Sequence, residues 1–269
     1  MTRISENKIN KLMTHLSPGS VVTAQWLKTQ GISPKLAWWY VHSGWLERIG
    51  NQAYQKKGEQ VNWIGAVSAL QTQLQLPVHV GGKSALELQG KAHFIVMQDI
   101  AQVTLFSRPK TKIPSWIHEH PVWSTLFSIY STSLFQQAET DISLIKKTIE
   151  GVTLQLSSPE RAIMELLHLV PQHQSLDEAA LIMENLAYLR PNLVQSLLEN
   201  CSSIKVKRLF LFLADRNQHE WLSALDMSKI NLGQGKRVIG VGGEYHPKYK
   251  ISVPKLKKEG EINDIGDIP

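Results

Sequence analysis

The chain has 269 residues, of which 42% are hydrophobic and 19% charged, a composition typical of a folded globular protein long enough for two domains. No apolar run approaches the ~20 residues needed to cross a bilayer, and the polar N-terminus lacks the apolar stretch of a signal peptide. Cys201 is the only cysteine, which excludes an internal disulfide and a cysteine-based zinc site, so we expect a cytoplasmic protein with no membrane partner.

The net charge of +6 is unevenly distributed along the chain. Residues 1–60 carry eight Lys and Arg against three Asp and Glu, and residues 201–269 carry twelve against eight. The middle stretch, residues 61–200, is acidic, with nine against twelve. Basic segments favour nucleic acid because they release the counterions condensed on a polyanion. An ordinary solvated surface is an equally good interpretation of the charge alone.

The first part of the chain predicts three short helices, over residues 6–16, 24–30 and 34–43. Each carries an apolar stripe at helical spacing, and the second and third begin at a capping hydroxyl and end at a glycine. The residues that start and stop them are Ser5, Pro18, Thr23, Gly31, Ser33 and Gly44. Two short helices joined by a tight turn form a helix-turn-helix.

A β-hairpin is predicted directly after the third helix, with strands over Trp45–Ile49 and Ala53–Lys57 and a turn at residues 50–52. A hairpin in this place is the wing of a winged helix. We therefore predict an α+β protein in which an N-terminal winged helix-turn-helix precedes a larger mixed α/β domain. The alternative is a small helical subdomain with no role in DNA binding.

The third helix of such a module lies in the major groove, with its N-terminal residues nearest the base edges. Lys35 suits a guanine or a phosphate, and Ser33 with the helix N-terminus suits a phosphate. Trp38 or Trp39 can pack against a sugar or a thymine methyl group, although we expect at least one of them to be partly buried. The candidate DNA contacts on this helix and the wing are Ser33, Lys35, Trp38, Trp39, His42, Arg48, Lys56 and Lys57.

The predicted domains are residues 1–75, which include a helix at 61–74 that bridges to the rest, residues 76–255, and a loose tail at 256–269. In the second domain, strands are predicted at 78–80, 103–106, 126–130 and 152–156. Helices are predicted at 83–89, from Ser158, from Ser175, at 191–201 and from Lys205. Residues 237–241 and 249–253 suggest a closing β-hairpin.

A search of this domain for chemistry finds no catalytic, cofactor or metal site. Pro77–Ser84 resembles a phosphate-binding loop but lacks its first glycine, so a tight strand-to-helix turn is favoured. His118–His120 has the wrong histidine spacing for a zinc-protease helix and suits a strand or loop. Cys201 lies on an apolar stripe and is expected in the core.

Two charged groups in this domain begin predicted helices. Arg161 is expected to pair with Glu165 one helical turn away. Lys205, Lys207 and Arg208 form a basic cluster, for which a solvated face is favoured over contact with DNA or with an acidic partner.

Three segments resemble the AbiEi family of antitoxins, which act in AbiE-type toxin–antitoxin systems. The winged-helix segment Gly31–Tyr54 is similar to that family's DNA-binding domain. Val78–Gly90 resembles the start of its antitoxin domain, and Val152–Ala162 its later strand-to-helix junction. The resemblance covers roughly residues 5–255, and its motifs consist of structural residues. One departure is Gln52, where such wings often carry glycine.

The resemblance implies a transcriptional regulator and antitoxin of a bacterial type IV toxin–antitoxin operon, commonly one that gives phage resistance. The N-terminal domain would bind repeats in the promoter of its own operon and repress it. The C-terminal domain would neutralise a nucleotidyltransferase toxin encoded next to it, without forming a stable complex. We accordingly expect a monomer in solution with no enzymatic activity of its own.

Two other classes of function stay open. A winged helix can deliver a nuclease or a nucleotide-modifying enzyme to DNA, although no strand-borne carboxylate pair followed by lysine supports this. Alternatively, the second domain can bind a small molecule and make the protein a ligand-responsive regulator. Cleavage of labelled DNA with Mg²⁺ would favour the enzyme, and a thermal shift with a metabolite would favour the ligand-responsive regulator.

Overall fold

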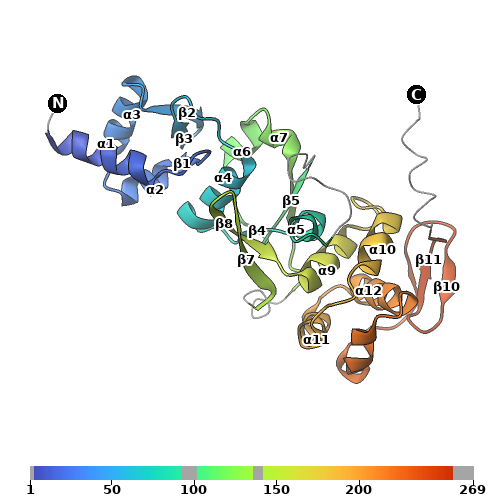
Figure 1. The fold of residues 1–269 in the computed structure, drawn as a ribbon. Helices are drawn as coiled ribbons and strands as arrows, with labels where there is room; N and C mark the ends of the chain where they lie inside the picture. The colour runs from blue at the N-terminus through green and yellow to red at the C-terminus, as the bar shows by residue number, and fades with distance from the viewer. Residues whose placement is uncertain (1–2, 92–101, 136–141, 257–269) are drawn as a thin grey trace. The chain divides into compact units, whose positions relative to one another are not determined.

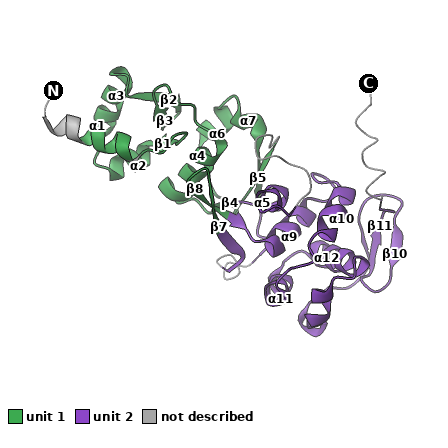
Figure 2. Ribbon diagram, in the orientation of Figure 1, with its two compact units in different colours: residues 1–79, 101–131, 146–155 green, residues 80–100, 132–145, 156–269 purple. Residues whose placement is uncertain are grey.

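The computed structural model describes residues 3–91, 102–135 and 142–256. The chain divides into two compact units, each assembled from separate stretches (Figure 2). Unit 1 comprises residues 1–79, 101–131 and 146–155, and unit 2 comprises residues 80–100, 132–145 and 156–269. The predicted fold class is confirmed, because an N-terminal winged helix-turn-helix precedes a larger part that mixes helices and strands.

The winged helix has the predicted order of elements (Figure 1). Its elements are α1 (Arg3–His15), β1 (Val22–Thr23), α2 (Ala24–Thr29), α3 (Pro34–His42), β2 (Leu46–Gly50) and β3 (Ala53–Lys56). The hydroxyls of Thr23 and Ser33 cap α2 and α3 by accepting a hydrogen bond from a backbone N–H three residues further on. Strand β3 is central in an antiparallel sheet of order β1-β3-β2.

Apolar side chains from the three helices and the sheet form one core in this module. Its buried members are Ile9, Leu12, Val22, Leu27, Ile32, Ala37, Tyr40, Leu46 and Tyr54. At the wing turn, Gln52 has a φ of 59°, in the left-handed region that glycine adopts most easily. The turn therefore has the backbone shape of a glycine turn although this chain has glutamine there.

The bridging helix is α4 (Trp63–Ser68), which continues as a π-helical turn, η1 (Ala69–Gln73). A Cβ atom built on Gly65 would lie 2.0 Å from the carbonyl oxygen of Gly19, so α4 approaches the turn after α1 at backbone contact distance. The Gln73 amide accepts from Thr23 N–H at 2.8 Å and donates to the Val21 carbonyl at 2.6 Å. These contacts fix the winged helix to the bridging helix.

Five strands form the second sheet, in the order β6-β5-β4-β8-β7. They are β4 (Val78–Val80), β5 (Val103–Ser107), β6 (Phe127–Ser131), β7 (Leu144–Ile149) and β8 (Val152–Ser157). Strands β5 and β6 pair in parallel, as do β4 and β8. Four of the five strands were predicted to within a residue at either end, and β7 was not.

The segment around His118–His120 is helical, so the predicted strand or loop is wrong. It forms α6 (Ser115–Glu119), which is followed by α7 (Trp123–Leu126). The single turn of α6 ends before Pro121 and buries the side chains of Trp116 and Ile117. This burial favours the helical conformation over a strand or loop. A Cβ atom built on Gly50 of β2 would lie 2.6 Å from the Trp116 Cβ, so α6 packs closely against the wing.

Unit 2 is organised around α9, against which α5, α10, α11 and α12 pack (Figure 1). The helices are α5 (Gly82–Leu88), α9 (Pro159–Leu169), α10 (Leu176–Glu184), α11 (Pro191–Asn200) and α12 (Ile204–Arg216). Two short 3₁₀ helices follow, η2 (Glu220–Ala224) and η3 (Met227–Lys229). The predicted caps Ser158 and Ser175 are confirmed, because each accepts from a backbone N–H in the first turn of its helix.

A small sheet of order β10-β11-β9 closes unit 2. Its strands are β9 (Arg237–Val238), β10 (Glu244–His246) and β11 (Ile251–Val253). The predicted hairpin between 237–241 and 249–253 is wrong, because β9 and β11 run parallel and the antiparallel partner of β11 is β10. Gly240 and Gly242, both at positive φ, turn the chain between β9 and β10.

Across the parts of the chain that the structure describes, no helix is long and apolar enough to cross a membrane. The loose tail expected at 256–269 lies outside the described residues apart from Leu256.

Candidate nucleic-acid interface

Helix α3 presents one polar face outward. Ser33, Lys35, Trp38 and His42 are exposed, whereas Tyr40 and its neighbours on the opposite face are buried. Lys35, Trp38 and His42 lie three and four residues apart, so they share one face of the helix. The Ser33 hydroxyl already accepts from Leu36 N–H at 3.2 Å, which places it at the helix N-terminus as the cap. This outer face has the position of the base-reading surface in a winged helix.

Trp38 and His42 form a stacked pair on this face. Their ring centroids are 3.6 Å apart with 28° between the planes, and Trp38 is 57% exposed. His42 Nδ1 lies 2.9 Å from the Trp38 carbonyl oxygen, which holds the imidazole against the indole. The pair therefore forms a flat aromatic platform before any ligand arrives.

Trp39 points the other way. It is partly buried and packs against the core of the winged helix, with its ring edge-on to Tyr40 at a centroid distance of 5.7 Å. The expectation that at least one of the two tryptophans is partly buried is confirmed. Of the pair, only Trp38 offers a broad exposed surface.

The basic residues predicted on the wing differ in their surroundings. Arg48 is exposed, with its guanidinium 5.9 Å from the centre of the Tyr54 ring. Lys57 is exposed and lies against Gly44, at the C-terminal end of α3. Lys56 forms an ion pair with Glu59 at 2.7 Å, which offsets its charge. The structure thus brings Lys57 near α3, whereas the ammonium group of Lys56 is already paired with Glu59.

Sequence reasoning missed Lys28, an exposed cation in the last turn of α2. In a helix-turn-helix, the helix before the recognition helix crosses the DNA backbone, where a lysine can meet a phosphate. The signal was present in the sequence, because Lys28 is three residues ahead of the glycine that ends α2.

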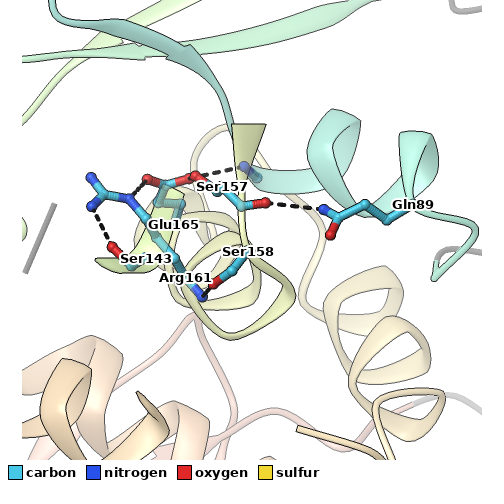
Figure 3. Close-up of polar contacts among 7 residues, drawn as sticks. Gln89, Ser143, Ser157, Ser158, Arg161 and Glu165 are labelled. Atoms are coloured by element: carbon cyan, nitrogen blue, oxygen red, sulfur yellow. Dashed lines mark hydrogen bonds and ion pairs between the residues drawn. The ribbon is translucent and has the colours of Figure 1, made fainter. Parts of the chain in front are cut away.

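The glycine turn after β4 donates a backbone hydrogen bond to the buried carboxylate of Glu165, whose polar contacts are drawn in Figure 3. Glu165 accepts from Gly82 N–H at 3.2 Å and from the Ser157 hydroxyl at 2.7 Å through one oxygen. Its other oxygen accepts from Arg161 Nε at 2.7 Å, and Arg161 also donates to the Ser143 hydroxyl. The predicted strand-to-helix turn and the predicted Arg161–Glu165 pair are both confirmed.

The solvated basic face predicted at the start of α12 is wrong. Lys205 donates to the carbonyls of His168 and Val170 at the C-terminus of α9, and Lys207 is buried. Arg208 is fully buried and donates to four backbone carbonyls, those of Leu232, Gly233, Gly235 and Lys250. Every residue of α12 from Val206 to Ala214 is buried, so this part of the helix lies in the interior, where its cations bond carbonyls.

Other features of the described residues offer less chemistry. No three His, Cys, Asp or Glu within 3–91, 102–135 and 142–256 gather closely enough to hold a metal ion. Cys201 is buried, as predicted, and burial raises the pKa of its thiol. A pocket of about 590 Å³ lies between the end of α12 and the closing sheet, lined by Phe212, His246 and Tyr249 among others. The ligand-responsive alternative would be tested there.

Models of two protein families match the chain. One, described as "Transcriptional regulator, AbiEi antitoxin N-terminal domain", matches residues 5–97. The other, described as "Transcriptional regulator, AbiEi antitoxin, Type IV TA system", matches residues 100–254. No curated protein sequence matches.

Among solved structures, the chain is similar to the crystal structure of the RV2827C protein from Mycobacterium tuberculosis. The TM-score is 0.63, and the likeness covers 93% of this chain and 92% of that chain. Because the sequence identity is 14%, this likeness supports the fold alone.

Proposed function

Because the chain belongs to the AbiEi antitoxin family of transcriptional regulators of type IV toxin–antitoxin systems, we propose that it has two linked roles. It represses its own operon by binding promoter repeats through the winged helix of residues 1–75. It also neutralises a nucleotidyltransferase toxin encoded next to it, through residues 76–255. It does both as a non-enzymatic protein that is monomeric in solution and forms no stable complex with the toxin.

The observation that carries the DNA-binding role is the outer face of α3. A lysine, a capping serine and an aromatic platform are exposed together there, and the cations Lys28, Arg48 and Lys57 lie on neighbouring elements. Such cations bind phosphates and fix the register, while side chains on the recognition helix meet base edges. The presence of both kinds of contact, to phosphates and to base edges, supports a sequence-specific DNA-binding module rather than a general polyanion binder.

The test is a mobility-shift titration of the full-length protein on the DNA upstream of its gene. We expect Lys35→Ala to weaken binding by about tenfold, the usual order for one lost base or phosphate contact. Lys112→Ala removes an exposed lysine of the same unit that lies outside α3 and the wing strands, and it is the matched control. Equal affinity of both variants and the wild type would contradict the assignment of α3.

Removing residues 1–60 is expected to abolish promoter binding. The deletion also uncovers Trp116 and Gly65, which pack against the removed segment. The point variants are therefore the primary test, and the deletion supports them. A truncated protein that still binds the promoter would refute the role of the winged helix.

The antitoxin role has its own test. Co-expression of this protein with the adjacent nucleotidyltransferase gene should restore growth that the toxin gene alone arrests. Purification of a tagged toxin from the same cells should recover little of this protein, because the proposal has no stable complex. Growth that stays arrested would refute the antitoxin role.

A further inference from the structure

The side chains that α3 exposes have an unusual chemistry for reading bases. Adenine is commonly read by bidentate hydrogen bonds from Asn or Gln, and guanine by bidentate hydrogen bonds from Arg or Lys. Residues 34–42 contain no Asn, Gln or Arg, and Lys35 is their one group of these types. The hydrogen-bonding groups of the exposed face are the Lys35 ammonium, the Ser33 hydroxyl, the Trp38 indole N–H and Nε2 of His42, whose Nδ1 already faces the Trp38 carbonyl. Hydrogen bonds therefore supply only part of what this face can recognise.

The exposed large apolar side chain of α3 is Trp38, which is 57% exposed. One face of the indole is covered by His42, whose ring is held by the Trp38 carbonyl at 2.9 Å. Because the stack already fixes the indole, little conformational freedom is lost when a partner covers its remaining surface. That surface is apolar, so burying it against an apolar group is favourable.

The major groove offers one apolar group at the base edges, the C5-methyl of thymine. We propose that Trp38, held in place by His42, reads thymine C5-methyl groups of the operator. The inference rests on the proposed function, since Trp38 meets base edges only when α3 lies in the groove. Trp38 is then a specificity-determining residue, and His42 is a positioning residue that acts through it.

The experiment removes the methyl groups from the DNA and leaves the hydrogen-bonding edges unchanged. The fragment upstream of the gene is amplified once with dTTP and once with dUTP, and full-length protein is titrated on each. Burying one methyl group is worth about fourfold in affinity. We expect the wild-type protein to bind the uracil fragment at least about fourfold more weakly than the thymine fragment.

Three variants assign this preference to one side chain. Trp38→Ala should bind both fragments equally, and His42→Ala should lower the ratio of the two affinities while Trp38 remains. Trp45→Ala is the matched control, because Trp45 is 42% exposed and lies in the same module but outside α3. We expect this control to keep the wild-type ratio. Circular dichroism confirms that each exposed substitution leaves the fold intact.

The possible outcomes separate this inference from the proposed function. A wild-type ratio near one overturns the thymine assignment while promoter binding stands. A ratio that persists in Trp38→Ala also overturns it, because the preference then comes from the altered shape or stiffness of the DNA. If the wild-type protein binds upstream DNA no better than unrelated DNA of equal length, the proposed function fails and the inference fails with it.

Discussion

At the scale of single residues, buried charges in unit 2 are matched by several partners each. Glu165 accepts three hydrogen bonds, and Glu160 accepts from the side chain and the backbone N–H of Arg190. A buried charge stripped of its partner costs far more than an exposed one, because water cannot replace the lost contact. These hydrogen bonds give both carboxylates a structural role in unit 2.

Glu165→Gln tests this account. The substitution leaves the buried Arg161 guanidinium without a compensating charge, so we expect the free energy of unfolding to fall by about 3–5 kcal/mol. Asp215→Asn breaks an ion pair of similar length, 2.8 Å to Lys248, at an exposed site. That control should change stability by less than about 1 kcal/mol. Urea unfolding of the three proteins checks both values, and equal losses would contradict the account.

The Glu160–Arg190 pair predicts a pH dependence. Burial raises the pKa of Glu160, but the hydrogen bonds from Arg190 outweigh burial and hold the pKa below its ordinary value. A carboxyl whose pKa is lowered by folding stabilises the protein above the ordinary value of 4.5 and loses this effect as the pH falls through the folded value. We expect Arg190→Met to be most destabilising near neutral pH.

The measurement is urea unfolding of wild type and Arg190→Met over a series from about pH 7 to about pH 3. The difference in unfolding free energy should shrink below pH 4.5, as Glu160 becomes protonated in the wild type. A difference that stays constant across the series would show that the ion pair does not control it.

Sequence spacing predicted the Arg161–Glu165 pair because the two residues are one helical turn apart. It could not predict Ser143, Ser157 or Gly82, which reach Glu165 from other segments of the chain. It also placed Lys205 and Arg208 at the surface, because a charged helix start is usually solvated. Their acceptors are backbone carbonyls, which every residue has, so the sequence does not show which carbonyls will accept.

At the scale of elements, close backbone approach joins the winged helix to its support. Gly65 allows α4 to lie against the Gly19 carbonyl, and Gly50 allows β2 to lie against Trp116. Both contacts join the winged helix to other elements of unit 1 at backbone distance. We infer that its orientation depends on these two contacts.

Gly65→Ala tests the first contact, and the sign of its effect is informative. In an ordinary helix, this change stabilises by about 1 kcal/mol. Here the new Cβ would lie 2.0 Å from a backbone oxygen, so we expect destabilisation by about 1–3 kcal/mol instead. Ser68→Ala, at the partly buried end of the same helix, is the control and should stay within about 0.5 kcal/mol. Thermal unfolding of both variants decides between the two signs.

The elements that could be predicted are those with a repeated local signal. Caps, glycine stops and apolar periodicity located α2, α3 and the two wing strands. Helix α6 and strand β10 were not predicted, although β4, which is as short as β10, was. Their conformation is set by distant partners, Gly50 for α6 and β11 for β10.

At the scale of the whole molecule, the proposed DNA-reading residues and the buried α12 belong to different units. Repression and toxin neutralisation should therefore be separable by point substitution. Each unit is assembled from three separate stretches of the chain, which the sequence did not predict. Parallel strand pairs such as β5 with β6 leave no local pattern in the sequence. The fold class needed only the order of elements and could be predicted.

Lys35→Ala is expected to weaken operator binding and to keep antitoxin action. Lys35 is exposed, so its removal leaves the packing of unit 2 unchanged. The measurement is growth rescue with toxin and antitoxin genes expressed from unrelated promoters. Arg208→Ala is the contrasting variant, because it strips a buried helix of its carbonyl contacts and should lose rescue. Loss of rescue by Lys35→Ala would show that both roles need the same surface.

The buried Arg208 also makes the order of synthesis matter. Its carbonyl acceptors at Leu232 and Lys250 are made 24 and 42 residues after it. Until they are made, burying the guanidinium among apolar side chains would leave it without these acceptors, which is costly. Unit 2 therefore reaches its final packing only after Lys250 has been made, so a chain terminated before that residue lacks a finished second unit.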